Sequence, residues 1–252
     1  MKAGTESTAQ FDSVVRSAII PPVCASDSRA QRTLILASGS PRRRQLLALL
    51  HVPFVVRPAD VQEENHCDET VAEMVLRLSQ DKARAAVRQG EVGYVVGADT
   101  SVFLDGKVLG KPVDAGDAVR MLRSLRGRAH TVFSGVTLLD SASGRMRSDL
   151  AETVVSMRDF SDEAIVAYVA TGDPMDKAGS YAIQYGDFAP VARIEGCYAN
   201  VMGLPLCHLY RLLRDAGLAP AQTPVAECDG FNRRTCGVAV DILSEQRRAT
   251  TL

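Results

Sequence analysis

The chain has 252 residues, 46% of them hydrophobic, and a formal net charge of −1 at pH 7. This length allows one large domain or two small ones, and the apolar fraction is enough for a core, which excludes a chain disordered throughout. The near-zero net charge excludes an overall basic field that would draw the protein to nucleic acid or to a membrane. No apolar stretch approaches about 20 residues, and the N-terminal region lacks the continuous apolar core of a secretory signal. We therefore expect a cytoplasmic protein with neither nucleic acid nor membrane as a partner.

The composition divides the chain into three parts. Residues 1–32 are rich in Ser, Ala and Thr and contain Pro21-Pro22, so we expect a flexible N-terminal extension. Residues 33–219 carry the periodic apolar pattern of a folded domain. Residues 220–252 lose that periodicity and are expected to form a peripheral C-terminal tail.

From Thr33 onward, short apolar runs alternate with amphipathic segments. Strands are predicted at 33–36, 54–56, 93–96, 102–104, 107–109, 131–139 and 150–157, and helices at 41–50, 70–87, 114–125, 161–170 and 204–216. The Asp105-Gly106 pair predicts a hairpin turn, and the two longest strands are expected to lie antiparallel, joined across residues 141–147. This mixture predicts an α/β fold with both parallel and antiparallel pairing.

The segment LASGSPRRRQLLALL (36–50) predicts an anion site at the start of a helix. Ser40 stands where an N-cap belongs, and Pro41 occupies the first helical position, where its missing N–H costs nothing. The free N–H groups and the dipole of such a helix start suit phosphate. The run Arg42-Arg43-Arg44 lies in the first turn, where positive charge disfavours the helix, so an anion is expected to compensate it. The alternative is a solvated basic turn.

Two carboxylates and two lysines are further candidates. Asp99, in GADT, follows a buried strand, and the carboxyl end of a strand is where α/β proteins present site residues. Glu63 lies in the loop ADVQEE, and the two carboxylates together would suit Mg²⁺ or Mn²⁺. Lys82, in LSQDKA, and Lys111, in LGKP, could contact phosphate. The alternatives are that Asp99 lies in an ordinary strand-ending turn, that Glu63 is a surface residue and that both lysines are solvated.

Several common sites are absent from the sequence. There is no Walker loop, no GxGxxG fingerprint and no GxSxG nucleophile elbow. The six cysteines form no CxxC pair and the four histidines show no ligand spacing, so reduced thiols are expected rather than structural zinc. The segment GDPMDKAGSYAIQ (172–184) is expected to contact a ligand, since the Gln184 amide is both a donor and an acceptor. Gln184 could equally be an ordinary surface amide.

In this order, the segments resemble the Maf family of nucleoside triphosphate pyrophosphatases over roughly residues 33–216. The motifs that carry the resemblance are SGSPRRRQLL, the glutamate after ADVQ, LSQDKA, GADT, LGKP, MLRSLRGRAHTVFSGV, DKAGSYAIQ and IEGCYANVMGLP. The resemblance implies an α/β fold related to inosine triphosphatase, with a twisted mixed β-sheet flanked by helices and two lobes around a central cleft. It also implies hydrolysis of a nucleoside triphosphate to the monophosphate and pyrophosphate, with a divalent cation, Mg²⁺ or Mn²⁺.

The resemblance further implies a role for each matching residue. Asp99 matches the proton acceptor, and whether it acts as a base or as a metal ligand beside Glu63 stays open. A glutamine, Gln62, stands where an acidic residue is common in the family. The residues expected to bind substrate are Ser38, Ser40, Arg42, Arg43, Lys82, Thr100, Lys111 and Gln184, of which Arg42, Thr100 and Gln184 match positions of substrate selection.

The DKAG form of the motif resembles the subgroup that acts on dTTP and UTP. Hydrolysis of 7-methyl-GTP or modified purine nucleotides is the alternative within the family. A non-catalytic nucleotide-binding regulator of cell division is the alternative from another class. The expected partner is a small-molecule nucleoside triphosphate, and association into a homodimer stays open.

Overall fold

The computed structural model describes residues 32–64, 66, 68–184, 186–218, 220 and 222–244. Apart from Arg32, the expected N-terminal extension lies outside the described residues, as do Cys24 and Cys67. Within the described ranges, no helix is both long enough and apolar enough to cross a lipid bilayer.

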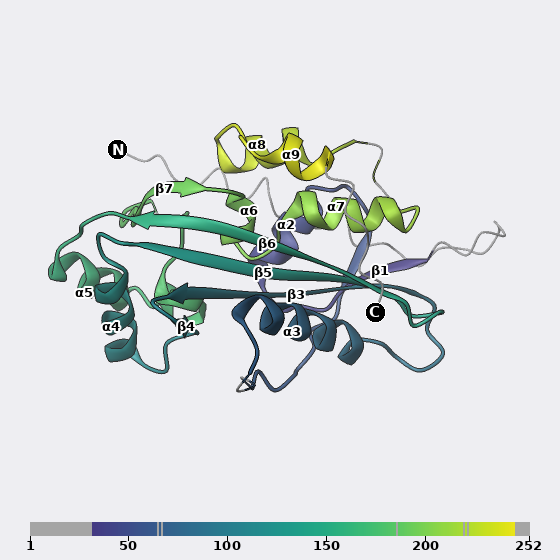
Figure 1. The fold of residues 1–252 in the computed structure, drawn as a ribbon, viewed down its shortest axis with the longest axis horizontal. Coiled ribbons are helices and arrows are strands. Elements are labelled where there is room, and N and C mark those ends of the chain that lie inside the picture. The colour runs from purple at the N-terminus through teal and green to yellow at the C-terminus, as the bar shows by residue number, and fades with distance from the viewer. Residues whose placement is uncertain are drawn as a thin grey trace.

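The described residues build a seven-stranded mixed sheet, which confirms the predicted fold class (Figure 1). β1 is parallel to β2 and to β3, and the other neighbouring pairs are antiparallel. The order across the sheet is β2 (Phe54–Val56), β1 (Thr33–Leu36), β3 (Gly93–Leu104), β5 (Ala129–Asp140), β6 (Met146–Met157) and β7 (Val191–Glu195), with β4 (Lys107–Leu109) pairing with β3.

The helices begin where the sequence places their caps. The Ser40 hydroxyl accepts a hydrogen bond from the backbone N–H of Arg43, as predicted, and the Ser161 hydroxyl accepts one from the backbone N–H of Ala164. Thr70 forms a reciprocal capping box with Glu73. The helices are α2 (Pro41–Ala48), α3 (Val71–Ala85), α4 (Ala115–Leu125), α5 (Asp162–Ala170), α6 (Tyr198–Val201), α7 (Leu206–Asp215), α8 (Val225–Asn232) and α9 (Ala239–Ser244), with 3-10 turns η1 (Asp173–Asp176) and η2 (Ala178–Ser180).

β3 differs from the sequence prediction. The expected strands 93–96 and 102–104 are parts of one strand of 12 residues, which pairs with β5 from Tyr94 to Phe103. Asp99 therefore lies in the middle of a strand and not at its carboxyl end. The continuous pairing with β5 overrides the weak strand propensity of Gly-Ala-Asp, because strand preference depends on neighbouring strands more than on the residue itself.

The other edge of β3 changes partner and leaves a gap in the sheet. β3 pairs with β1 as far as Val96 and with β4 from Val102 onward. Between these points, residues 97–101 pair with β5 alone in the described structure. β1 ends here and the chain turns into α2, so the gap is a point where strand connections diverge, the usual place for a ligand in an α/β sheet.

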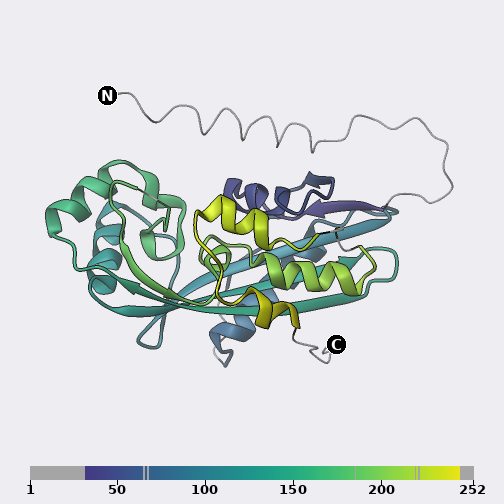
Figure 2. The same cartoon turned by 90° about the horizontal axis from the view of Figure 1, so that it is seen from above.

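Two apolar cores share the long strands and form the two lobes that were expected. One core packs α2, α6 and α7 against β1 and the first half of β3, with Leu46, Leu204 and Leu209 fully buried. The other packs α4 and α5 against the second half of the sheet around Leu122 and Ile165. α4 and α5 lie at one end of the long strands and α7 at the other (Figures 1 and 2). The gap in β3 falls between the two lobes.

α3 crosses the opposite face of the sheet at unusually short range. A Cβ on Gly97 would lie 2.0 Å from the carbonyl oxygen of Ser79, and one on Gly135 would lie 2.2 Å from that of Val75. Only glycine allows the helix backbone this close to β3 and β5. The close approach brings the side chains of α3 to the middle of β3, beside the gap.

The segment after residue 220 contains two helices where the sequence shows no clear periodicity. α8 and α9 pack on the side of the molecule that carries α6 and α7 (Figures 1 and 2). Arg211 Nη1 on α7 donates to the carbonyl oxygen of Ile242 at 2.8 Å, and His51 Nε2 lies 3.6 Å from a carboxylate oxygen of Glu227. The burial of Cys228 and Ala239 shows that this segment adds to the core.

Candidate active site

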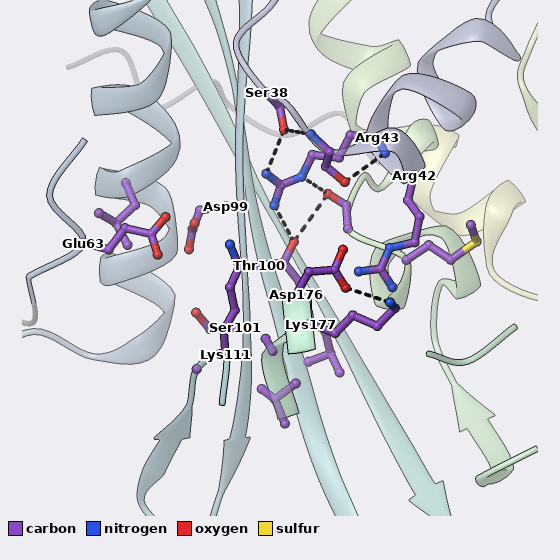
Figure 3. A pocket seen from close by; sticks show the side chains of 18 of the residues that line it. Ser38, Arg42, Arg43, Glu63, Asp99, Thr100, Ser101, Lys111, Asp176 and Lys177 are labelled. Atoms are coloured by element: carbon purple, nitrogen blue, oxygen red, sulfur yellow. Dashed lines mark hydrogen bonds and ion pairs between the residues drawn. The ribbon is translucent and has the colours of Figure 1, made fainter. Parts of the chain in front are cut away.

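A cavity of about 560 Å³ opens at the gap in β3, between the two lobes (Figure 3). This volume falls within the range of about 300–1,000 Å³ that is typical of small-molecule sites. Its walls come from the loop after β1, the start of α2, the middle of β3, α3, η1 and the turn after α6. Nine predicted site residues line it, namely Ser38, Ser40, Arg42, Arg43, Glu63, Lys82, Asp99, Thr100 and Lys111.

Successive side chains of β3 point to opposite faces of the sheet, and functional side chains from both faces line this cavity. Asp99 points to the α3 side, where it meets Lys82, and Thr100 points to the α2 side, where it meets Arg43. Within a complete sheet the two side chains would be separated by the backbone layer. They line one cavity because residues 97–101 form an open edge.

Arg43 holds the loop after β1 in place. Its guanidinium donates from Nε to the carbonyl oxygen of Gly203 at 2.8 Å, from Nη1 to Ser38 Oγ at 3.3 Å and from Nη2 to Thr100 Oγ1 at 3.3 Å. Burial lowers the pKa of Arg43, and the negative charges of Asp99 and Glu63 oppose that shift. Its partners are neutral oxygens, so its positive charge is available to an anion in the cavity.

The three consecutive arginines have different positions. Arg42 and Arg43 line the cavity, and Figure 3 shows Arg42 on the side that carries Asp176 and Lys177. Arg44 is exposed and does not line the cavity. The sequence placed all three in the first turn of the helix, and the helical rotation of about 100° per residue separates them.

A buried lysine joins the two candidate metal ligands. Lys82 Nζ on α3 lies 2.6 Å from Asp99 Oδ1 and 2.6 Å from Glu63 Oε1. Asp99 and Lys82 are 5% and 8% exposed, so their pairing takes place away from bulk water. Lys82 therefore neutralises part of the negative charge of the two carboxylates. The sequence analysis had assigned Lys82 only to phosphate binding.

The electrostatics of Glu63 keep it ionised. Its partial burial by itself raises the pKa, but the hydrogen bond and charge of Lys82, followed by the charges of Lys111 and Arg43, hold the pKa below its ordinary value. Two carboxylates on one side of a cavity offer the hard oxygen donors that Mg²⁺ and Mn²⁺ take. Among the described residues no group of three or more His, Cys, Asp and Glu side chains is placed to hold a metal ion. The carboxylate oxygens on this side of the cavity come from Glu63 and Asp99, and both residues also contact Lys82.

The opposite wall comes from the segment that was expected to contact a ligand. Asp176, Lys177 and Tyr181 all line the cavity. Lys177 Nζ donates to Asp176 Oδ1 at 2.7 Å, and the Tyr181 hydroxyl lies 2.8 Å from Nε2 of the buried His130. Burial lowers the pKa of His130 to about 4, so the ring that supports Tyr181 is neutral at pH 7.

Gln184 lies apart from the other predicted residues, because it is exposed and does not line the cavity. Its contact with a base therefore stays a prediction. Sequence reasoning missed Gly203, whose carbonyl oxygen receives Arg43, and the apolar lining. The segment IEGCYANVMGLP gave the only sequence signal for Gly203. The apolar residues that line the cavity include Val102, Val108, Val132, Val201 and Met202.

The charges around the cavity favour an anionic ligand. Five basic and three acidic side chains line it. Lys82 pairs with Glu63 and Asp99, and Lys177 pairs with Asp176. Within the described part of the chain, Arg42, Arg43 and Lys111 form no ion pair with a carboxylate, although their charges act on Glu63 and Asp176 from farther away.

Comparison with known proteins gives consistent results. The model of a family described as Maf-like protein matches residues 33–216. A dTTP/UTP pyrophosphatase of Geobacter metallireducens is 46% identical over 184 residues, which are 73% of this chain and 96% of that protein. Proteins of the same name from Geobacter sulfurreducens and Thermomicrobium roseum are each 47% identical, over 73% and 76% of this chain and over 96% and 87% of their own lengths.

Proposed function

Because this chain belongs to the Maf family, we propose that it is a dTTP/UTP pyrophosphatase, an enzyme that hydrolyses these nucleotides to the monophosphate and pyrophosphate. The observation that carries the proposal is the charge arrangement of the cavity. Three cations without a carboxylate partner, Arg42, Arg43 and Lys111, face a carboxylate pair that Lys82 holds. A polyphosphate supplies the negative charge that these cations lack, and the carboxylates supply an acceptor for the proton of water.

The reaction places water in line with the α-phosphorus. Asp99 Oδ1 is held by Lys82, which leaves Oδ2 to accept a proton from the attacking water. The new bond joins the water oxygen to the α-phosphorus, and the bond from that phosphorus to the bridging oxygen of the β-phosphate breaks, which releases pyrophosphate. Arg42, Arg43 and Lys111 stabilise the charge on the leaving group, aided by the N–H groups at the start of α2.

Glu63 and Asp99 would hold a divalent cation, Mg²⁺ or Mn²⁺. When bound, such an ion neutralises phosphate charge and polarises the bond to the leaving group. The residues of the chain would still do the positioning: Arg43 fixes Ser38, Thr100 and Gly203 around the phosphates, and Lys82 sets the direction of the Asp99 carboxylate.

The test is pyrophosphate release from a panel of nucleotides in the presence of Mg²⁺ or Mn²⁺. The panel contains dTTP, UTP, CTP, dATP, GTP and 7-methyl-GTP, each assayed for kcat/KM. We expect dTTP and UTP to be the best substrates. A clear preference for 7-methyl-GTP would favour the other subgroup of the family, and tight binding without turnover would indicate a regulator.

The arginine run provides a matched pair of variants. Arg42→Ala is expected to lower kcat/KM for dTTP about ten- to hundredfold, since it removes a charge-assisted contact worth about 1.5–3 kcal/mol. Arg44→Ala, two residues away and outside the cavity, is expected to retain nearly full activity. Steady-state kinetics and thermal melting of both variants check the prediction. Equal losses in the two variants would contradict a role for Arg42 in the cavity.

A further inference from the structure

Four cysteines outside the nucleotide cavity meet at a second, small cavity of about 30 Å³. Cys197 directly precedes α6 and Cys207 lies in the first turn of α7. Cys228 on α8 and Cys236, between α8 and α9, belong to the C-terminal segment. All four are free thiols in this structure. Their sequence spacing predicted no site, so folding alone brings them together.

The four thiols are close enough to affect one another's ionisation. Burial raises the pKa of Cys197 to about 11, and Cys236 adds to that shift. Burial raises the pKa of Cys228 to about 12, with smaller contributions from Cys197 and Cys236. Burial also raises the pKa of Cys207, and each of the other three thiols adds to the increase. The buried thiols are therefore protonated at pH 7 and react slowly.

Cys236 is the member of the cluster that solvent can reach. It is partly exposed, whereas Cys197, Cys207 and Cys228 are buried. An oxidant in solution therefore meets Cys236 first, because thiol reactivity requires access as well as a thiolate.

The segment that carries Cys236 is docked beside Cys197. The guanidinium of Arg234, two residues before Cys236, lies 5.6 Å from the ring centroid of Tyr198, which directly follows Cys197. The backbone N–H of Cys236 donates to Asp229 Oδ1 at 2.9 Å, which fixes this turn against α8. These two contacts place the exposed thiol and the domain thiol on the same small cavity.

We propose that Cys236 and Cys197 form a reversible disulfide in the presence of a small-molecule disulfide such as oxidised glutathione. The Cys236 thiolate attacks one sulfur of glutathione disulfide, forms a mixed disulfide and releases one glutathione. Cys197 then gives up its proton to solvent and attacks the Cys236 sulfur, which releases the second glutathione. Two protein thiols are oxidised and one glutathione disulfide is reduced.

A bond between two thiols fits this cluster better than a bound metal does. Among the described residues no group of three or more His, Cys, Asp and Glu side chains is placed to hold a metal ion. A disulfide needs only one pair of sulfurs in reach of each other. The disulfide would tie the C-terminal segment to α6, and the chain continues from α6 to Gly203 in the wall of the nucleotide cavity. The inference rests on the cysteines alone and does not depend on the proposed reaction.

The experiment uses the full chain with Cys24→Ser and Cys67→Ser, which leaves the four cysteines of the cluster. The protein is incubated with oxidised glutathione, alkylated and analysed by intact mass and by peptide mapping without reductant. We expect the free thiols to fall from four to two and a cross-linked peptide to join Cys197 and Cys236. Because the bond closes a loop of roughly 40 residues, we expect the melting temperature to rise by about 5 °C or more. Reduction of the bond with dithiothreitol should lower the melting temperature to its original value.

Two variants sharpen the result. Cys236→Ser is expected to abolish the cross-link, and Cys228→Ser to leave it in place. A cross-link from Cys236 to Cys228 or Cys207, or a mixed glutathione disulfide that proceeds no further, would overturn the proposal. So would one equivalent of zinc in the purified protein that protects all four thiols from alkylation. The peptide map of the protein with all four cysteines gives the answer even where a variant fails to fold.

Discussion

Replacing Asp99 with asparagine is expected to lower kcat for dTTP by about 10²–10⁴-fold, the range attributed to a positioned general base. Asparagine has the same shape but accepts no proton from water at neutral pH. Its amide oxygen can still receive the hydrogen bond from Lys82, which lies 2.6 Å from Asp99 Oδ1. We therefore expect the fold and nucleotide binding to survive, so that KM changes much less than kcat.

The matched control is Asp105→Asn in the turn between β3 and β4. Asp105 is exposed, lies outside the cavity and has a φ of 50°, a conformation that asparagine tolerates well. This variant makes the same chemical change six residues from Asp99 and should keep nearly full activity. Pyrophosphate release measures kcat for both proteins, and equilibrium binding of dTTP measures affinity. Turnover of Asp99→Asn close to that of the unchanged protein would exclude Asp99 as the proton acceptor.

Replacing Lys82 with methionine is expected to reduce both activity and stability. Methionine keeps the length of the side chain but leaves the buried Asp99 carboxylate without its partner, a loss that typically costs about 3–5 kcal/mol for a buried pair. We expect kcat/KM to fall by at least about 100-fold, because Asp99 loses the contact that orients it and repulsion between the two carboxylates is no longer screened. Lys107→Met is the control, because Lys107 is the exposed first residue of β4, and it should change neither quantity.

A double variant distinguishes a lost charge partner from lost packing. Adding Asp99→Asn to Lys82→Met removes the uncompensated charge, so the double variant should unfold at a higher temperature than Lys82→Met alone. If the two melt at the same temperature, the ion pair does not account for the instability.

The pH dependence of stability gives a second check on the role of Lys82. Lys82 lowers the pKa of Glu63 in the folded protein, so the stability that Glu63 contributes is present above its unfolded pKa and lost as pH falls through the lower folded pKa. Without Lys82, the folded pKa of Glu63 rises toward its unfolded value, so this contribution shrinks and the stability should depend less on pH in this range.

The features that could be predicted from the sequence depend on residues that lie close together in the chain. Ser40 and Ser161 cap their helices through hydrogen bonds that span three residues, and the apolar periodicity of α3 and α4 is a property of a few consecutive turns. The ordered motifs from 33 to 216 also led to the family and to nine of the residues that line the cavity. These inferences needed no knowledge of how distant segments pack.

The contacts between side chains that are distant in the sequence became evident from the folded structure. Lys82 reaches Asp99 and Glu63 because Gly97 and Gly135 let α3 approach the sheet. Asp99 and Thr100 share one cavity because, in the described structure, residues 97–101 of β3 pair with β5 on one edge and with no strand on the other. The four cysteines likewise meet through the docking of α8 and α9 on the domain. Such contacts depend on strand pairing and on the depth of helix packing, which are fixed by many residues together. A local sequence pattern does not contain that information.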